Sequence, residues 1–276
     1  MSPSKHTPEV SLETSLNTYV TENNLTKFFK PGDRLLKDLA REAIALSKEP
    51  SSIYSNLDNV KRLAILSLYQ LVVYCDDSGS MGNEKRYEQQ ADIVVRICDL
   101  ATKIQNDCCV DLCFMNDSSA MHLPSEWIPG ALRAVRPSGG TTLGTSLRSK
   151  ILAPLVYNVL DGDEPLTRPI LICAITDGYP YEEPDDAFKN AIIECRSRLL
   201  TMDYEHTAVQ FLISQIGGDS NATRFLNKLR SDSQLNDMLY CMPDRLDERL
   251  RELREAESKL EEWLLRMLTS AMVREE

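Results

Sequence analysis

Short apolar runs alternate with amphipathic helical patterns along the middle of the 276-residue chain. The runs are rich in β-branched residues, and the segments between them repeat apolar residues at spacings of three and four, as helices do. Strands are predicted at 70–75, 108–115, 120–123, 168–176, 207–216 and 239–242, and helices at 84–105, 126–135, 185–202 and 220–231. The stretch 137–160 is predicted to be a glycine turn that leads into a further helix. Strands that alternate with helices indicate βαβ units. We therefore predict the α/β class, with a mostly parallel sheet and helices on both faces.

The two ends of the chain lack this alternation. Residues 1–32 are polar and contain three prolines, so they are expected to form a mobile tail with at most one short helix. Two amphipathic helices are predicted within 33–68, and one long helix from Asp244 to Met272. The predicted organisation is a tail at 1–32, a helical extension at 33–68, the α/β domain at 69–242 and a C-terminal amphipathic helix at 243–276. The last helix is expected to pack on its own domain or on the N-terminal helices, with a coiled coil as the alternative.

The composition of the chain makes some classes of binding partner and some cellular compartments less expected than others. The net charge of −11 disfavours binding to nucleic acid or to an anionic membrane surface. The start of the chain has no apolar signal region, and no stretch reaches the roughly 18 apolar residues of a membrane span, so a cytoplasmic, intracellular protein is expected. The eight cysteines are expected to be buried free thiols, because most lie in apolar runs and none has zinc-site spacing.

An oxygen-rich sequence, Asp76-Asp77-Ser78-Gly79-Ser80, directly follows the first predicted strand. A carboxylate and two hydroxyls at alternating positions suit a hard cation such as Mg²⁺, whereas Asp77 is expected to face outward from the loop. Two other short motifs stand at predicted loops, Gly139-Gly140-Thr141-Thr142 and Thr176-Asp177-Gly178. Each motif taken singly is ordinary turn or helix-cap chemistry.

Taken together and in this order, the three motifs resemble the metal-ion-dependent adhesion site of von Willebrand factor type A domains. The resemblance covers residues 69–242 and implies a Rossmann-like open sandwich with a six-stranded sheet of order 3-2-1-4-5-6. In that order the first and fourth strands are neighbours where the order reverses, which is where open α/β sheets bind ligands. The resemblance implies metal ligation by Asp76, Ser78, Ser80, Thr141 and Asp177, with one or both aspartates acting partly through water. Thr141 is preferred to Thr142 because it follows the glycine pair.

The function that this resemblance implies is a non-catalytic interaction module. Mg²⁺ is the expected cation, with Mn²⁺ or Ca²⁺ as alternatives, and an acidic residue of a protein partner would complete its coordination. A metal-dependent hydrolase or phosphotransferase is one alternative, although the matched loops offer no evident base. A structural subunit of an intracellular complex is another.

The remaining candidate residues add no second site. The three histidines, His6, His122 and His206, stand in unrelated contexts, and the sequence contains no phosphate-binding loop. Tyr179 and Tyr181 follow Asp177 on the predicted metal face. They are expected either to contact a partner or to pack under their loop.

Overall fold

The computed structural model describes residues 7–105, 109–118, 120–162 and 164–273, and it contains one six-stranded sheet. The strands are β1 (Gln70–Cys75), β2 (Val110–Phe114), β3 (Ala120–Leu123), β4 (Ile170–Thr176), β5 (Val209–Gln215) and β6 (Leu239–Cys241). Their order is β3-β2-β1-β4-β5-β6, and every neighbouring pair is parallel except β2 with β3. The predicted α/β class, sheet order and Rossmann-like open sandwich are confirmed.

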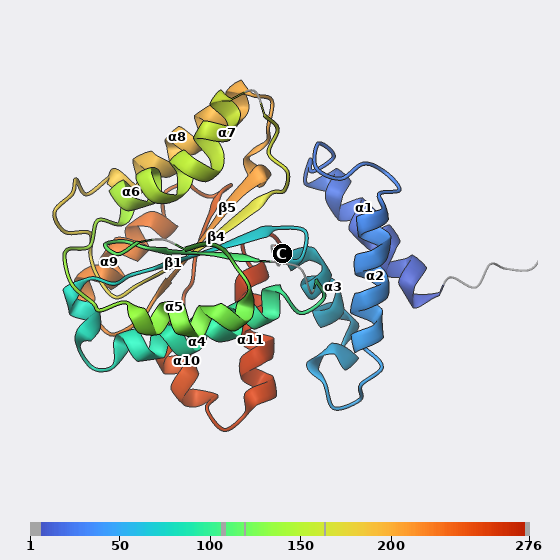
Figure 1. Ribbon diagram of the computed structural model, residues 1–276, viewed down its shortest axis with the longest axis horizontal. Coiled ribbons are helices and arrows are strands. Elements are labelled where there is room, and N and C mark those ends of the chain that lie inside the picture. The colour runs from blue at the N-terminus through green and yellow to red at the C-terminus, as the bar shows by residue number, and fades with distance from the viewer. Residues whose placement is uncertain (1–6, 106–108, 119, 163, 274–276) are drawn as a thin grey trace, which may run out of the picture.

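Helices cover both faces of this sheet (Figure 1). One face carries α4 (Arg86–Ala101), α5 (Ile128–Ala134) and the C-terminal helices; the other carries α6 (Leu143–Ser146), α7 (Asn158–Asp161), α8 (Ala187–Thr201) and α9 (Ser220–Arg230). Between α6 and α7 the chain is wound as a π-helix over Leu147–Tyr157. Each face of the sheet has its own hydrophobic core. Along β1, Leu71 and Val73 belong to the core on the α4 face, and Val72 and Tyr74 belong to the core on the α8 face. Alternate residues of a strand point to opposite faces, so a strand covered on both sides reads as an unbroken apolar run.

The N-terminal region contains a packed helix, so the prediction of a mobile tail at 1–32 is wrong for the described part. Helix α1 (Pro8–Glu22) begins with a Thr7 cap and buries Leu12, Leu16, Tyr19 and Val20. These four residues lie at helical spacing, and the many polar residues on the other face conceal the pattern. The Tyr19 hydroxyl lies 3.1 Å from that of Tyr69, immediately before β1.

Two further helices, α2 (Arg34–Leu46) and α3 (Leu57–Leu66), correspond to the pair predicted within 33–68. They pack with α1 and with each other, and Figure 1 shows all three gathered beyond one end of the sheet. None of the described helices combines the length and apolar character that a membrane crossing needs.

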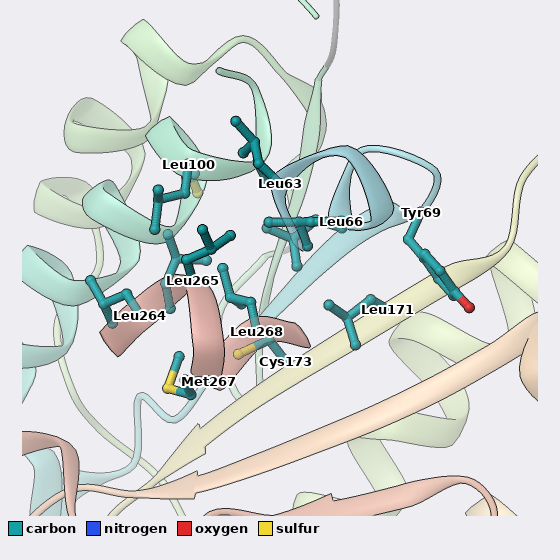
Figure 2. Packing of buried hydrophobic residues seen from close by; sticks show 14 of the residues in the cluster. Leu63, Leu66, Tyr69, Leu100, Leu171, Cys173, Leu264, Leu265, Met267 and Leu268 are labelled. Atoms are coloured by element: carbon teal, nitrogen blue, oxygen red, sulfur yellow. The ribbon is translucent and has the colours of Figure 1, made fainter. Parts of the chain in front are cut away.

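The C-terminal segment forms two helices, so the prediction of one long helix from Asp244 to Met272 is also wrong. They are α10 (Leu246–Glu252) and α11 (Glu257–Thr269), and Ala256 between them has the non-helical angles φ −125° and ψ 69°. The apolar spacing continues through the break without a glycine or proline, so tertiary packing decides it. Both helices contact α4, and α11 also contacts α3, which buries Leu264, Leu265 and Leu268 (Figure 2).

The described residues include seven cysteines, and six of them are buried, as predicted. Cys109 is partly exposed, and Cys108 lies outside the described residues. Burial raises the pKa of the Cys173 and Cys195 thiols to about 12.

Candidate metal site

The first and third motifs meet where β1 and β4 end, at the reversal of the sheet order. The two strands pair in parallel up to Cys75 and Ile175, and the Asp76 N–H continues the ladder by donating to the Ile175 carbonyl at 3.0 Å. This register places Asp76 beside Thr176 and puts Asp177 one residue further along. Strand pairing therefore brings together two motifs that are about 100 residues apart in the sequence.

The second motif is held against the other two by backbone hydrogen bonds. The Gly139 carbonyl accepts from the Gly79 N–H at 3.1 Å, and the Thr141 carbonyl accepts from the Tyr181 N–H at 3.0 Å. Gly139 has a φ of +83°, and a Cβ at this position would lie 2.6 Å from Asn116 Oδ1. A glycine is required here for both reasons.

Four of the five predicted ligands line one cavity of about 380 Å³ at this edge: Ser78, Ser80, Thr141 and Asp177. The Ser78 and Ser80 hydroxyls are hydrogen-bonded at 3.1 Å, and the Ser80 hydroxyl donates to Asp177 Oδ1 at 2.8 Å. Thr142 is directed elsewhere, because its hydroxyl is hydrogen-bonded to that of Ser146 at 2.9 Å. Thr141 therefore lines the cavity, and Thr142 does not.

The fifth predicted ligand, Asp76, lies behind the cavity wall. Its Oδ1 accepts from the Ser78 N–H at 2.8 Å, its Oδ2 accepts from the Thr176 hydroxyl at 2.6 Å, and the residue is fully buried. Burial raises the pKa of the Asp76 carboxyl to about 6, and repulsion from Asp177 adds to this while the hydrogen bonds oppose it. A carboxylate in this position can act on a cation in the cavity through a water molecule.

The donor set fits a hard divalent cation. It consists of three neutral hydroxyls and two carboxylates, which is an all-oxygen set of the kind that Mg²⁺ accepts. The two buried carboxylates repel each other, and a cation between them would relieve that repulsion. Over the described ranges, no three His, Cys, Asp or Glu side chains are grouped so as to hold a metal ion, so the hydroxyls are essential to any such site here.

An arginine that the sequence did not reveal also lines the cavity. Arg86 Nη1 lies 2.8 Å from Asp177 Oδ2, and Arg86 Nη2 lies 2.7 Å from Glu84 Oε2. The side chains of Arg86 and Asp177 are 15% and 0% exposed. Hydrogen bonds to Asp177 and then to Glu84 raise the pKa of the Arg86 guanidinium, which is therefore a permanent charge in the site.

Asp77 does not face outward, contrary to the prediction from sequence. Its carboxylate is buried and accepts from the N–H groups of Asn116 and Asp117 at 2.8 and 2.7 Å. The reason is that the loop after β2 needs acceptors for its N–H groups, and the two oxygens of the Asp77 side chain supply them. Asp77 fixes the loop that supports Gly139.

The two tyrosines that follow Asp177 have different environments. The ring of Tyr179 packs edge-on against Phe225 of α9, with centroids 5.8 Å apart. The side chain of Tyr181 is 69% exposed at the rim of the cavity. His122 and His206 do not line this cavity, and His6 lies outside the described residues.

The chain resembles known proteins in its three-dimensional structure and not in its sequence. No protein-family model matches the sequence, and no curated protein matches it. Solved structures of proximal thread matrix protein 1 from the mussel byssus are similar: one crystal form has 16% identity and a TM-score of 0.48 over 70% of this chain. A second structure of that protein has 15% identity and a TM-score of 0.47 over 72% of this chain. A third, which has a zinc-occupied MIDAS motif, has 16% identity and a TM-score of 0.46. This chain spans about half the length of that protein, covering 47% of it in each case. The fold assignment given above rests on the sheet order of this chain itself.

Proposed function

We propose that this chain is a divalent-cation-dependent protein-interaction module. Asp76, Ser78, Ser80, Thr141 and Asp177 hold Mg²⁺, with Mn²⁺ or Ca²⁺ as alternatives, and a carboxylate of a protein partner completes the coordination. The module is not an enzyme. When bound by these residues, the cation would supply a positively charged coordination position for a partner carboxylate oxygen.

The observation that carries this proposal is the continuous chain of oxygens from Ser78 through Ser80 to Asp177. It joins the ends of two neighbouring parallel strands, and it lines an open cavity together with the Thr141 side chain. Exposed Tyr181 stands at the rim of the same cavity. Exposed aromatic side chains are common contact residues in protein interfaces, so the rim suits a protein partner.

Calorimetry with Mg²⁺, Mn²⁺ and Ca²⁺, combined with thermal unfolding, tests the cation site directly. A cation at about 100 times its Kd would stabilise the folded protein by about 2.7 kcal/mol. Thr141→Val removes one ligand without changing side-chain shape and is expected to weaken binding at least about tenfold, or about 1.4 kcal/mol. Thr142→Val is the matched control, because that hydroxyl bonds Ser146 instead.

The partner step is tested by affinity capture in Mg²⁺ and in EDTA. Captured proteins should be lost in EDTA and lost with Thr141→Val, but retained with Thr142→Val. Capture that persists in EDTA, or equal cation binding by the two variants, would contradict the proposal and favour a structural subunit.

Metal-dependent hydrolysis is the competing function. Among the described residues that line the cavity, none is a histidine, lysine or cysteine, so the candidates for a general base or nucleophile are hydroxyls and the carboxylates of Asp177 and Asp219. The Asp219 carboxylate already accepts from the Asn221 and Ala222 N–H groups as the cap of α9. Turnover of p-nitrophenyl phosphate that disappears with Asp177→Asn would establish the hydrolase in place of the interaction module.

A further inference from the structure

We propose that Arg86 is a second positive group for the acidic ligand and determines what the site accepts. The inference rests on the proposed function. A ligand carboxylate binds the cation through one oxygen and, through the other, replaces Glu84 on the guanidinium. Arg86 therefore weakens binding of the cation alone and strengthens binding of the carboxylate.

The inner edge of the guanidinium shares Asp177 with the predicted cation. Asp177 Oδ1 accepts from the Ser80 hydroxyl on the ligand side, and Oδ2 accepts from Arg86 Nη1 at 2.8 Å. A cation held by Ser80 and Asp177 would thus have a fixed positive charge on the other side of the same carboxylate. Like charges so close together repel, and the low exposure of both side chains limits screening by water.

The outer edge of the guanidinium already carries a carboxylate of this chain. Glu84 Oε2 accepts from Arg86 Nε at 3.3 Å and from Nη2 at 2.7 Å. The Glu84 side chain is 72% exposed, and an ion pair at so exposed a side chain is weak. Glu84 occupies the position that a partner carboxylate would take, and it can leave without disturbing the core.

The backbone conformation on both sides of Arg86 fixes the position of its side chain at the cavity. Glu84 and Lys85 both have left-handed backbone angles, with φ of 52° and 60°, which non-glycine residues adopt only at a cost. On the opposite side, Gly217 has a φ of 75°, and a Cβ there would lie 2.7 Å from Arg86 Nε. Two strained residues and one glycine thus give the guanidinium a fixed place beside Asp177.

The test measures Mn²⁺ binding to the full chain, first alone and then with glutarate as the probe carboxylate. Arg86→Gln should bind Mn²⁺ alone about tenfold more tightly, because a neighbouring positive charge is removed. Its Mn²⁺-loaded form should bind glutarate about tenfold more weakly, because a charged hydrogen-bond donor is lost. Glu84→Gln should bind glutarate more tightly, by about fivefold, because the competing carboxylate is gone.

Two further variants control this test. Lys85→Gln removes an exposed positive charge next to both residues and should change both affinities by less than about twofold. Arg86→Lys keeps the charge, and so protects the fold if Arg86→Gln unfolds; it should bind Mn²⁺ as the unchanged protein does but lose glutarate affinity, since an ammonium cannot present two donor edges. Circular dichroism checks folding.

The outcomes separate the two proposals. Failure of the unchanged protein to bind Mn²⁺ would overturn the proposed function, and with it the role of Arg86. Normal Mn²⁺ binding combined with equal glutarate affinity in the unchanged protein, Arg86→Gln and Arg86→Lys would overturn the role of Arg86 alone. Opposite changes in the affinities of Arg86→Gln for Mn²⁺ and for glutarate support it.

Discussion

The Thr176 hydroxyl donates a 2.6 Å hydrogen bond to the Asp76 carboxylate, across two strands that pair in register up to the preceding residues. Asp76 is fully buried, and this bond helps to hold its carboxylate in place together with the bond from the Ser78 N–H. Thr176 is the last residue of β4, so the sheet itself orients the acidic group behind the cavity.

Thr176→Val should therefore destabilise the protein although it removes only a hydroxyl. A buried carboxylate would lose one of its donors, which typically costs about 1–3 kcal/mol. Urea unfolding of the metal-free protein measures this loss. Thr201→Val is the control, because that hydroxyl bonds only the Ser197 carbonyl at an exposed helix end; equal effects of the two changes would show that Thr176 has no special role.

The pH dependence of cation binding should follow Asp76. Its pKa is raised from 3.8 to about 6 in the folded protein, so folding favours the protonated carboxyl. The stability that this gives the metal-free protein is complete below about pH 4 and is lost as the pH rises through about 6. Mg²⁺ needs the ionised form, so the rise in Tm on adding Mg²⁺ should grow between pH 5 and pH 7.

Asp76→Asn isolates this titration. The variant cannot ionise at position 76, so its metal-free Tm should fall less between pH 5 and pH 7 than that of the unchanged protein. A Mg²⁺-induced rise in Tm that is the same at pH 5 and pH 7 would argue against Asp76 as a cation ligand.

Helix α1 should contribute strongly to stability. Leu16 is fully buried, so Leu16→Ala is expected to cost about 2–5 kcal/mol. Val10 of the same helix is 42% exposed, and Val10→Ala should have little effect. Urea unfolding measures the free energy of unfolding of both variants. A Leu16→Ala variant as stable as Val10→Ala would show that α1 is not packed on the rest of the protein.

The buried thiols should resist alkylation in the native protein. Cys173 and Cys195 are buried and their pKa values are raised to about 12, so little reactive thiolate forms at pH 8. Cys109 is partly exposed and should react first with iodoacetamide. Mass spectrometry of digests made before and after unfolding in guanidinium checks the order, and early labelling of Cys173 would be inconsistent with this core.

Much of the sheet could be predicted because each strand is a local pattern. β1 and β3 have the predicted ranges, since short apolar runs bounded by polar residues are typical of strands in a covered sheet. The candidate ligands could be chosen for a related reason. Parallel strands end at the same edge, so oxygen-bearing residues that follow neighbouring strands must converge there.

Other features depend on contacts that no local pattern records. The sequence stripe continues from Leu253 to Leu260, yet packing on α3 and α4 divides this segment into α10 and α11. The position of the Arg86 side chain also depends on such contacts. It requires the left-handed backbone at Glu84 and Lys85 and the close approach of Gly217.

The sequence by itself determined the strands, most of the helices and the set of oxygen donors at the strand ends. These follow from residue type and spacing, which act over a few residues. Only the tertiary structure decided that α1 is packed, that Asp77 is buried and that Arg86 pairs with Asp177. Each of these three depends on free energy gained between segments distant in the chain, and that gain is fixed only when the whole fold forms.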